Sequence, residues 1–72
     1  MSSRTYSLTE IGGTSTESVD DAIRNAMSRA AASLRHLDWF EVTDIHGHVR
    51  DGEVRHFQVT MKVGCRLEDP TP

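Results

Sequence analysis

The sequence predicts an α+β fold in which a three-stranded antiparallel sheet packs on one helix, in the chain order strand, helix, strand, strand. Three observations predict it. Apolar side chains recur at three- and four-residue steps from residue 19 to residue 37, which is typical of an amphipathic helix. From residue 57 to residue 67 they fall on every second position, as in a half-buried strand. Between these segments, Asp51-Gly52 indicates a two-residue hairpin turn.

The first strand is expected over residues 6–11, where Tyr6 and Ile11 alternate onto opposite sides of the chain. Gly12-Gly13 then indicates a turn, because glycine pairs commonly interrupt a strand. We therefore expect a short first strand that ends before the glycines.

The helix is expected to begin at Ser15 or Ser18 and to run to about His36. Serine oxygens at a helix start accept hydrogen bonds from the free N–H groups of the first turn. The predicted apolar stripe comprises Val19, Ala22, Ile23, Ala26, Met27, Ala30, Leu34 and Leu37. Its many alanines allow a sheet or a neighbouring helix to approach closely.

The remaining two strands form a hairpin around Asp51-Gly52, and a two-residue turn makes the position numbers of cross-strand partners add to a constant. The predicted pairs are Phe40 with Val63, Val42 with Met61, and Ile45 with Gln58. A right-handed crossover through the helix makes the first two strands parallel, so the third lies between them, in the order 1-3-2. Phe40 and Val42 then lie on the helix-facing side, and the other face of the sheet stays uncovered.

The uncovered face is predicted to be an interface or a ligand wall. Its predicted members are Trp39, Glu41, Thr43, Ile45, Gln58, Thr60, Lys62 and Arg66. Trp39, the only tryptophan, offers a flat aromatic surface, and the Gln58 amide offers a donor beside an acceptor. Together they suit a planar heteroaromatic ligand. Trp39 taken alone favours packing at the helix end or at a subunit contact, and Gln58 alone is equally consistent with a solvated or cross-strand glutamine.

Magnitudes favour a pocket between two copies of the chain. Stacking on one ring contributes ~1–3 kcal/mol, and two net hydrogen bonds add ~1–3 kcal/mol. Micromolar binding needs ~8 kcal/mol, so we expect a second protomer to close the pocket. Self-association also compensates for the small core, because a chain of 72 residues buries only ~60% of its unfolded surface. The single cysteine, Cys65, excludes an intramolecular disulfide.

Composition argues against several classes of protein. The net charge of −3 and the absence of a Lys/Arg cluster argue against nucleic acid as a partner. No apolar run approaches the ~20 residues that span a bilayer, and the N-terminus lacks a secretion signal. We therefore expect a cytoplasmic protein with no membrane partner, forming one domain over residues 1–72 with loose ends at residues 1–4 and 69–72.

No catalytic motif is present, so an enzyme is not expected. His46 and His48 share a strand face and His56 lies across the hairpin, but firmly spaced cysteine or carboxylate ligands are missing. We therefore expect no metal site. Cys65 falls on the predicted core side, where a thiol behaves as a small hydrophobic group.

Three segments resemble the dodecins: residues 34–42 (LRHLDWFEV), 56–64 (HFQVTMKVG) and 66–68 (RLE). The resemblance extends from Tyr6 through Glu68. It implies a β-α-β-β protomer assembled into a hollow homododecamer, whose two-fold pockets each hold a pair of antiparallel flavins. It further implies a non-catalytic role in flavin storage and buffering, with self and flavin as the partners.

The resemblance also assigns roles to residues. Trp39 matches the stacking tryptophan, which quenches the excited flavin and limits its photochemistry, and Gln58 matches the glutamine that contacts the pyrimidine edge. Arg66 matches a basic residue that meets the phosphate of FMN, the expected cofactor, with riboflavin and FAD as alternatives. His46 stands where many relatives carry arginine, which predicts a weaker or more pH-dependent phosphate contact.

Three rival functions stay open at this point. The first is a purely structural shell in which Trp39 packs protein against protein. The second is a small enzyme that uses flavin for redox turnover, and the third is a histidine metal-binding module.

Overall fold

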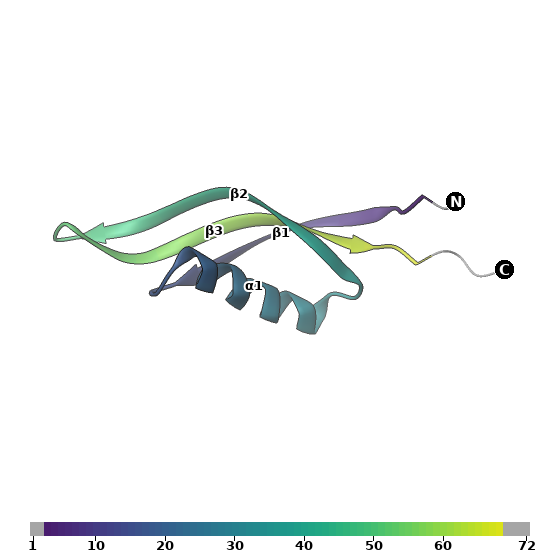
Figure 1. Ribbon diagram of the computed structural model, residues 1–72, viewed down its shortest axis with the longest axis horizontal. Coiled ribbons are helices and arrows are strands. Elements are labelled where there is room, and N and C mark those ends of the chain that lie inside the picture. The colour runs from purple at the N-terminus through teal and green to yellow at the C-terminus, as the bar shows by residue number, and fades with distance from the viewer. Residues whose placement is uncertain (1–2, 69–72) are drawn as a thin grey trace.

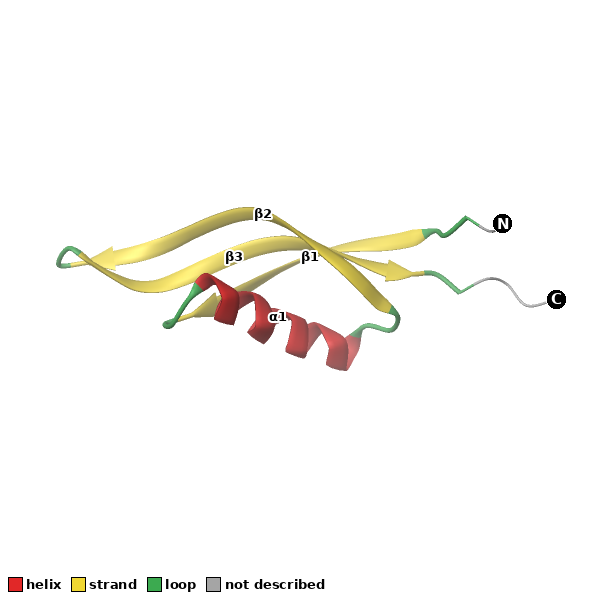
Figure 2. Cartoon of the chain, in the orientation of Figure 1, coloured by secondary structure: helices red, strands yellow, loops and turns green. Residues whose placement is uncertain are grey.

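The computed structural model describes residues 3–68. They form the elements β1 (Tyr6–Ser15), α1 (Val19–Ser33), β2 (Leu37–Arg50) and β3 (Glu53–Arg66). The strands make one sheet in the order β1-β3-β2, with β3 antiparallel to both neighbours, and α1 lies on one side of it (Figures 1 and 2). This arrangement confirms the predicted fold. Residues 1–2 and 69–72 of the ends expected to be loose lie outside the described part.

β1 is longer than predicted, because it continues through the two glycines to Ser15. Gly12 and Gly13 are paired with β3, so the expectation of a turn there was wrong. The structure gives Gly13 another role. A Cβ at this position would collide with the carbonyl oxygen of Ala22 and lie 2.7 Å from the Cβ of Ala26. Gly13 therefore lets α1 lie close against the strand.

α1 begins after Ser18, one of the two predicted starts. The Ser18 hydroxyl accepts a hydrogen bond from the N–H of Asp21 at 2.9 Å. Ser15 is buried in β1 and supports the cap from the strand, since its Oγ lies 2.6 Å from the Asp21 carboxylate. The two serines thus join the end of β1 to the first helical turn.

The helix ends at Ser33, three residues earlier than predicted. Leu34 is already extended, and its N–H donates to the carbonyl of Ala30 at 2.8 Å. His36 then adopts a left-handed backbone with φ of 59°, which reverses the chain into β2. The predicted helical position Leu37 is the first residue of β2. A tight connection to the sheet therefore replaces the last predicted helical turn.

The core forms between α1 and the two strands that it covers, β1 and β3 (Figure 1). Its buried members are Ala22, Ala26, Val59, Met61 and Val63. Val59, Met61 and Val63 of β3 face α1, as the alternation predicts. β2 lies beside the strands that α1 covers, so Val42 packs against the edge of the core but Phe40 stays 46% exposed.

The hairpin turn is confirmed, since Asp51 and Gly52 have φ of 53° and 77°, the positive values that a type I′ turn requires. The predicted pairs Phe40 with Val63 and Val42 with Met61 are also confirmed. The third predicted pair was wrong, because Ile45 lies opposite Val59.

The cause is an extra residue, Thr43, which has no partner on β3. This β-bulge moves residues 44–48 of β2 by one position relative to β3, and a second irregularity between His48 and Val49 restores the register before the turn. Asp44 and His46 consequently take the uncovered face, where Thr43 and Ile45 were expected. The Thr43 hydroxyl donates to the carbonyl of Thr60 at 3.1 Å.

The described chain is elongated, with extents of 60 × 20 × 15 Å, and the β2-β3 hairpin projects beyond the helix (Figure 1). Several large apolar side chains are exposed along the described chain. Besides Trp39, they are Leu8, Phe40, Ile45, Val49, Val54 and Leu67. So much exposed apolar surface on a small chain is typical of a subunit that associates with other subunits. Within residues 3–68, no helix has the length and apolarity needed to cross a membrane.

Candidate functional site

Trp39 lies near the start of β2, opposite Gly64 of β3. Its indole rests directly over this glycine. A Cβ built on Gly64 would fall 2.5 Å from Cζ2 and 2.6 Å from Nε1 of the ring. One face of the indole is thus laid against the central strand, and Trp39 remains 37% exposed. The missing side chain of Gly64 creates the space for the ring.

Tyr6 of β1 confines the indole from another side. The centroids of the two rings lie 5.8 Å apart, and the ring planes meet at 67°, an edge-to-face arrangement. The Tyr6 hydroxyl donates a 2.9 Å hydrogen bond to the carboxylate of Asp38, whose other neighbour is the Arg4 guanidinium at 3.8 Å. Asp38 can reach across because it is an unpaired bulge residue of β2.

Gln58 lies farther along the same face of β3 and is half-buried. Its partner on β2 is His46, so the structure brings these two predicted site residues together. The His46 Nδ1 lies 2.9 Å from Oδ2 of Asp44. This contact orients the imidazole and leaves Nε2 available for another partner.

The four predicted site residues divide into two groups on the uncovered face. Trp39 lies opposite Gly64, and Arg66 is two positions farther along β3. Gln58 with His46 lies six residues in the other direction, which at ~3.3 Å per residue corresponds to about 20 Å. Trp39 and Gln58 lie on the same face of the sheet, as predicted, but within one protomer they are too far apart to contact the same ligand atoms.

The sequence did not predict three residues that surround the indole, which are Gly64, Tyr6 and Asp38. A signal for Gly64 existed, because its number and that of Trp39 add to the same constant as the predicted hairpin pairs. A glycine opposite an aromatic residue in a strand indicates a close approach. No such signal existed for Tyr6, since nothing in the hairpin sets the register of β1.

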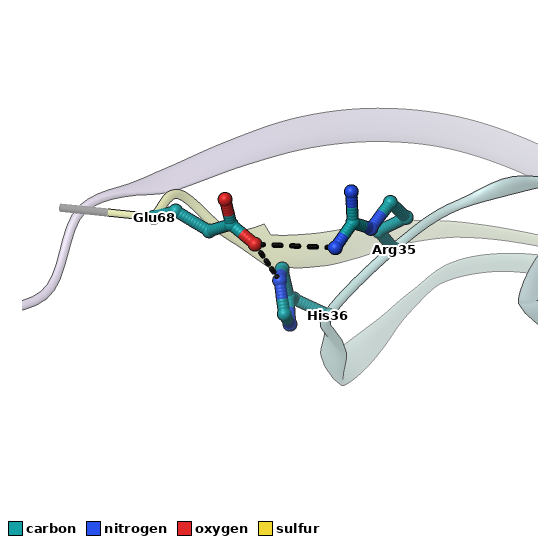
Figure 3. Close-up of polar contacts among 3 residues, drawn as sticks. All are labelled: Arg35, His36 and Glu68. Atoms are coloured by element: carbon teal, nitrogen blue, oxygen red, sulfur yellow. Dashed lines mark hydrogen bonds and ion pairs between the residues drawn. The ribbon is translucent and has the colours of Figure 1, made fainter. Parts of the chain in front are cut away.

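The connection between α1 and β2 is held by a polar cluster of Arg35, His36 and Glu68 (Figure 3). Glu68 Oε2 lies 2.6 Å from Nε2 of His36 and 3.3 Å from Nη2 of Arg35. The hydrogen bond with His36 and the charge of Arg35 lower the pKa of the Glu68 carboxyl. In addition, the N–H of Arg66 donates to the carbonyl of His36 at 2.9 Å. The α1-β2 connection is thereby fastened to the end of β3.

The remaining polar candidates do not form a reactive centre in the described chain. His48 and His56 face each other across the hairpin, with stacked rings 4.5 Å apart. Among residues 3–68, no three His, Cys, Asp or Glu side chains gather in a way that would hold a metal ion. Cys65 is buried beside the core, on the side that its position predicts.

Comparison with known proteins places these features in a family. The dodecin family model matches residues 5–68. The dodecin of Thermus thermophilus is 46% identical over 66 residues, which cover 92% of this chain and 96% of the relative. The structure of dodecin from Streptomyces coelicolor is 54% identical, with a TM-score of 0.87 over 97% of this chain and all of the other. Dodecin from Streptomyces davaonensis is 54% identical, with a TM-score of 0.86 over 94% of this chain and 100% of that one. The chain therefore belongs to the dodecin family of flavin-binding proteins.

Proposed function

We propose that this protein stores and buffers flavin without catalysis, as a homododecamer whose pockets lie between protomers related by two-fold symmetry. Residues 1–72 act as one flavin-binding domain, and FMN is the expected ligand, with riboflavin and FAD as alternatives. Membership of the dodecin family supports a flavin ligand and an oligomer. The observation that carries the proposal is the indole of Trp39, which lies over Gly64 and remains 37% exposed.

One Trp39 ring can stack on only one ligand, because Gly64 occupies its inner face. That single contact contributes ~1–3 kcal/mol, well below the ~8 kcal/mol of micromolar binding. A second flavin stacked on the first, followed by a second indole, supplies the missing contacts. A pair of antiparallel flavins between two tryptophans satisfies both constraints.

The separation of Trp39 from Gln58 supports the same arrangement. The two residues lie about 20 Å apart along β3, on one face of the sheet. When two protomers lie antiparallel across a two-fold axis, the Trp39 end of one meets the Gln58 end of the other. Gln58 then reads the pyrimidine edge of a flavin that stacks on the partner's Trp39, through its paired donor and acceptor.

We assign the phosphate end of FMN to Arg66 and His46. Arg66 carries a permanent charge near Trp39, whereas His46 stands beside Gln58 with Asp44 as its neighbour. The Asp44 carboxylate repels a phosphate, and an imidazole offers fewer donors than a guanidinium. The phosphate contact is therefore expected to be weaker than one made by an arginine at this position.

Quenching of the bound flavin follows from the stack, because an electron-rich indole in contact with the flavin ring offers a fast route for its excited state to decay. The stack also argues against an enzyme. A flavin covered on one face by Trp39 and on the other by a second flavin offers no open ring face to a hydride donor. We accordingly expect no steady oxidation of a reduced nicotinamide, and sustained turnover would favour the redox enzyme.

Titration of FMN, riboflavin and FAD with the protein, followed through flavin fluorescence, tests this function. We expect strong quenching that saturates at one flavin per protomer, with light scattering showing a dodecamer. Trp39→Ala should remove most of the quenching. Ser7→Ala is the control, since Ser7 is exposed on the opposite face of β1. Unchanged emission at micromolar wild-type protein would instead favour a structural shell.

A further inference from the structure

We propose that Tyr6 is a positioning residue of the flavin site, and that it keeps the indole of Trp39 flat on Gly64 before any ligand arrives. The inference rests on the proposed function, because it concerns how the stacking surface is prepared. It is carried by three contacts around one ring: Gly64 beneath it, Tyr6 at an angle to it, and Asp38 holding Tyr6.

The geometry leaves the indole few alternatives. Gly64 lets the ring lie down on the sheet, but a glycine has no side chain that would keep it there. Tyr6 faces Arg66 on β3 and so stands on the uncovered face, one register step beyond the row that contains Trp39 and Gly64. With the ring planes at 67°, Tyr6 blocks the rotation that would lift the indole toward β1.

The ring contact contributes more than the hydrogen bond. Asp38 and Arg4 have side chains that are 38% and 59% exposed, so water competes with the Tyr6 hydroxyl for the carboxylate. The edge-to-face contact keeps its strength because it is made by apolar surface. The hydroxyl bond therefore sets the direction of the Tyr6 ring, and the ring in turn restrains Trp39.

A restrained indole binds flavin better than a mobile one, since less side-chain freedom is lost on binding. Loss of an edge-to-face aromatic pair corresponds to about a three- to tenfold change in an equilibrium constant. A tilted indole also overlaps the flavin less, so quenching at saturation becomes incomplete. A purely structural role for Tyr6 in the edge strand β1 would change thermal stability but neither of these properties.

The test compares Tyr6→Leu, which removes the ring, with Tyr6→Phe, which removes only the hydroxyl. Ser7→Ala serves as the control in the same strand. Because Trp39 is the only tryptophan, its fluorescence anisotropy in flavin-free protein reports the mobility of this one ring. FMN titration then gives the dissociation constant and the residual flavin emission at saturation.

For Tyr6→Leu we expect about three- to tenfold weaker FMN binding, higher residual emission and faster loss of Trp39 anisotropy. Tyr6→Phe should stay within about twofold of the wild type. Wild-type values of all three quantities in Tyr6→Leu would overturn the proposal. Should that variant fail to assemble, Tyr6→Met, which keeps a long apolar chain without a ring, is judged by the same criteria.

The outcome is separable from that of the proposed function. If wild-type protein leaves flavin emission unchanged, the flavin function fails, and the flavin-free anisotropy still decides whether Tyr6 restrains the indole. If the wild type quenches and Tyr6→Leu matches it in every readout, only the positioning role fails.

Discussion

Gly64→Ala is expected to impair flavin binding while leaving the protomer folded. The added methyl would lie 2.5 Å from Cζ2 and 2.6 Å from Nε1 of Trp39. Carbon atoms in contact prefer a separation of ~3.5–4.0 Å, so the indole must move outward by about 1 Å or tilt. The ring can make this movement because it is partly exposed, whereas the central strand cannot.

The consequence for affinity is larger than the consequence for stability. Stacking is worth ~1–3 kcal/mol per ring, so its loss weakens FMN binding about 5- to 150-fold. The backbone itself tolerates alanine, since a Gly→Ala change at a compatible position stabilises a protein by ~0.4–1 kcal/mol. We therefore expect a large rise in the dissociation constant with a melting temperature close to that of the wild type.

Gly12→Ala provides a matched control in the same sheet. Gly12 is exposed, and a Cβ there would meet only the carbonyl oxygen of Val59, at an ordinary 3.7 Å. FMN fluorescence titration of both variants, with Trp39 emission recorded in parallel, compares the two glycines directly. If Gly64→Ala binds and quenches FMN as well as Gly12→Ala does, the close contact between Gly64 and the indole is not required for flavin stacking.

Three further outcomes are expected. Gly13→Ala should destabilise the protein by about 1–3 kcal/mol in urea unfolding, because its methyl would press on α1; a wild-type midpoint would contradict the close packing. Ser18→Ala should cost ~1 kcal/mol in the same assay by removing the helix cap, and Ser18→Asn should restore most of it. The hydrogen bond with His36 lowers the pKa of the Glu68 carboxyl, so this contact stabilises the folded chain only while the carboxyl is ionised. Its contribution is complete above the unfolded carboxyl pKa of about 4.3 and is lost as pH falls through the lower folded pKa. NMR titration should show this pKa rising in His36→Asn, a residue that tolerates the left-handed backbone, and an unchanged value would refute the contact.

Much of the fold was predictable because its signals are local. The apolar period of α1 and the alternation of β3 each follow from contact with one buried face. The Asp51-Gly52 turn depends on two positive φ angles, which these residue types adopt readily. From that turn, the pairing of Phe40 and Val42 followed by counting.

The wrong predictions share a different cause. Gly12-Gly13 looks like a turn in the sequence, and only the approach of α1 reveals why Gly13 is needed within a strand. Likewise, the alternation around Thr43 does not predict a bulge, although the bulge moves His46 to the face that carries Gln58. The early end of the helix at Ser33 depends on the distance to β2, which propensity does not contain.

The sequence by itself determined which residue types recur at which period, and hence the elements, their order and the face shared by Trp39 and Gln58. Only the tertiary structure decided that Gly64 and Tyr6 shape the surface around the indole, and that His46 stands beside Gln58. The physical reason is that parity within a strand is a property of the backbone, whereas a binding surface depends on register between strands and on close contacts between side chains distant in sequence.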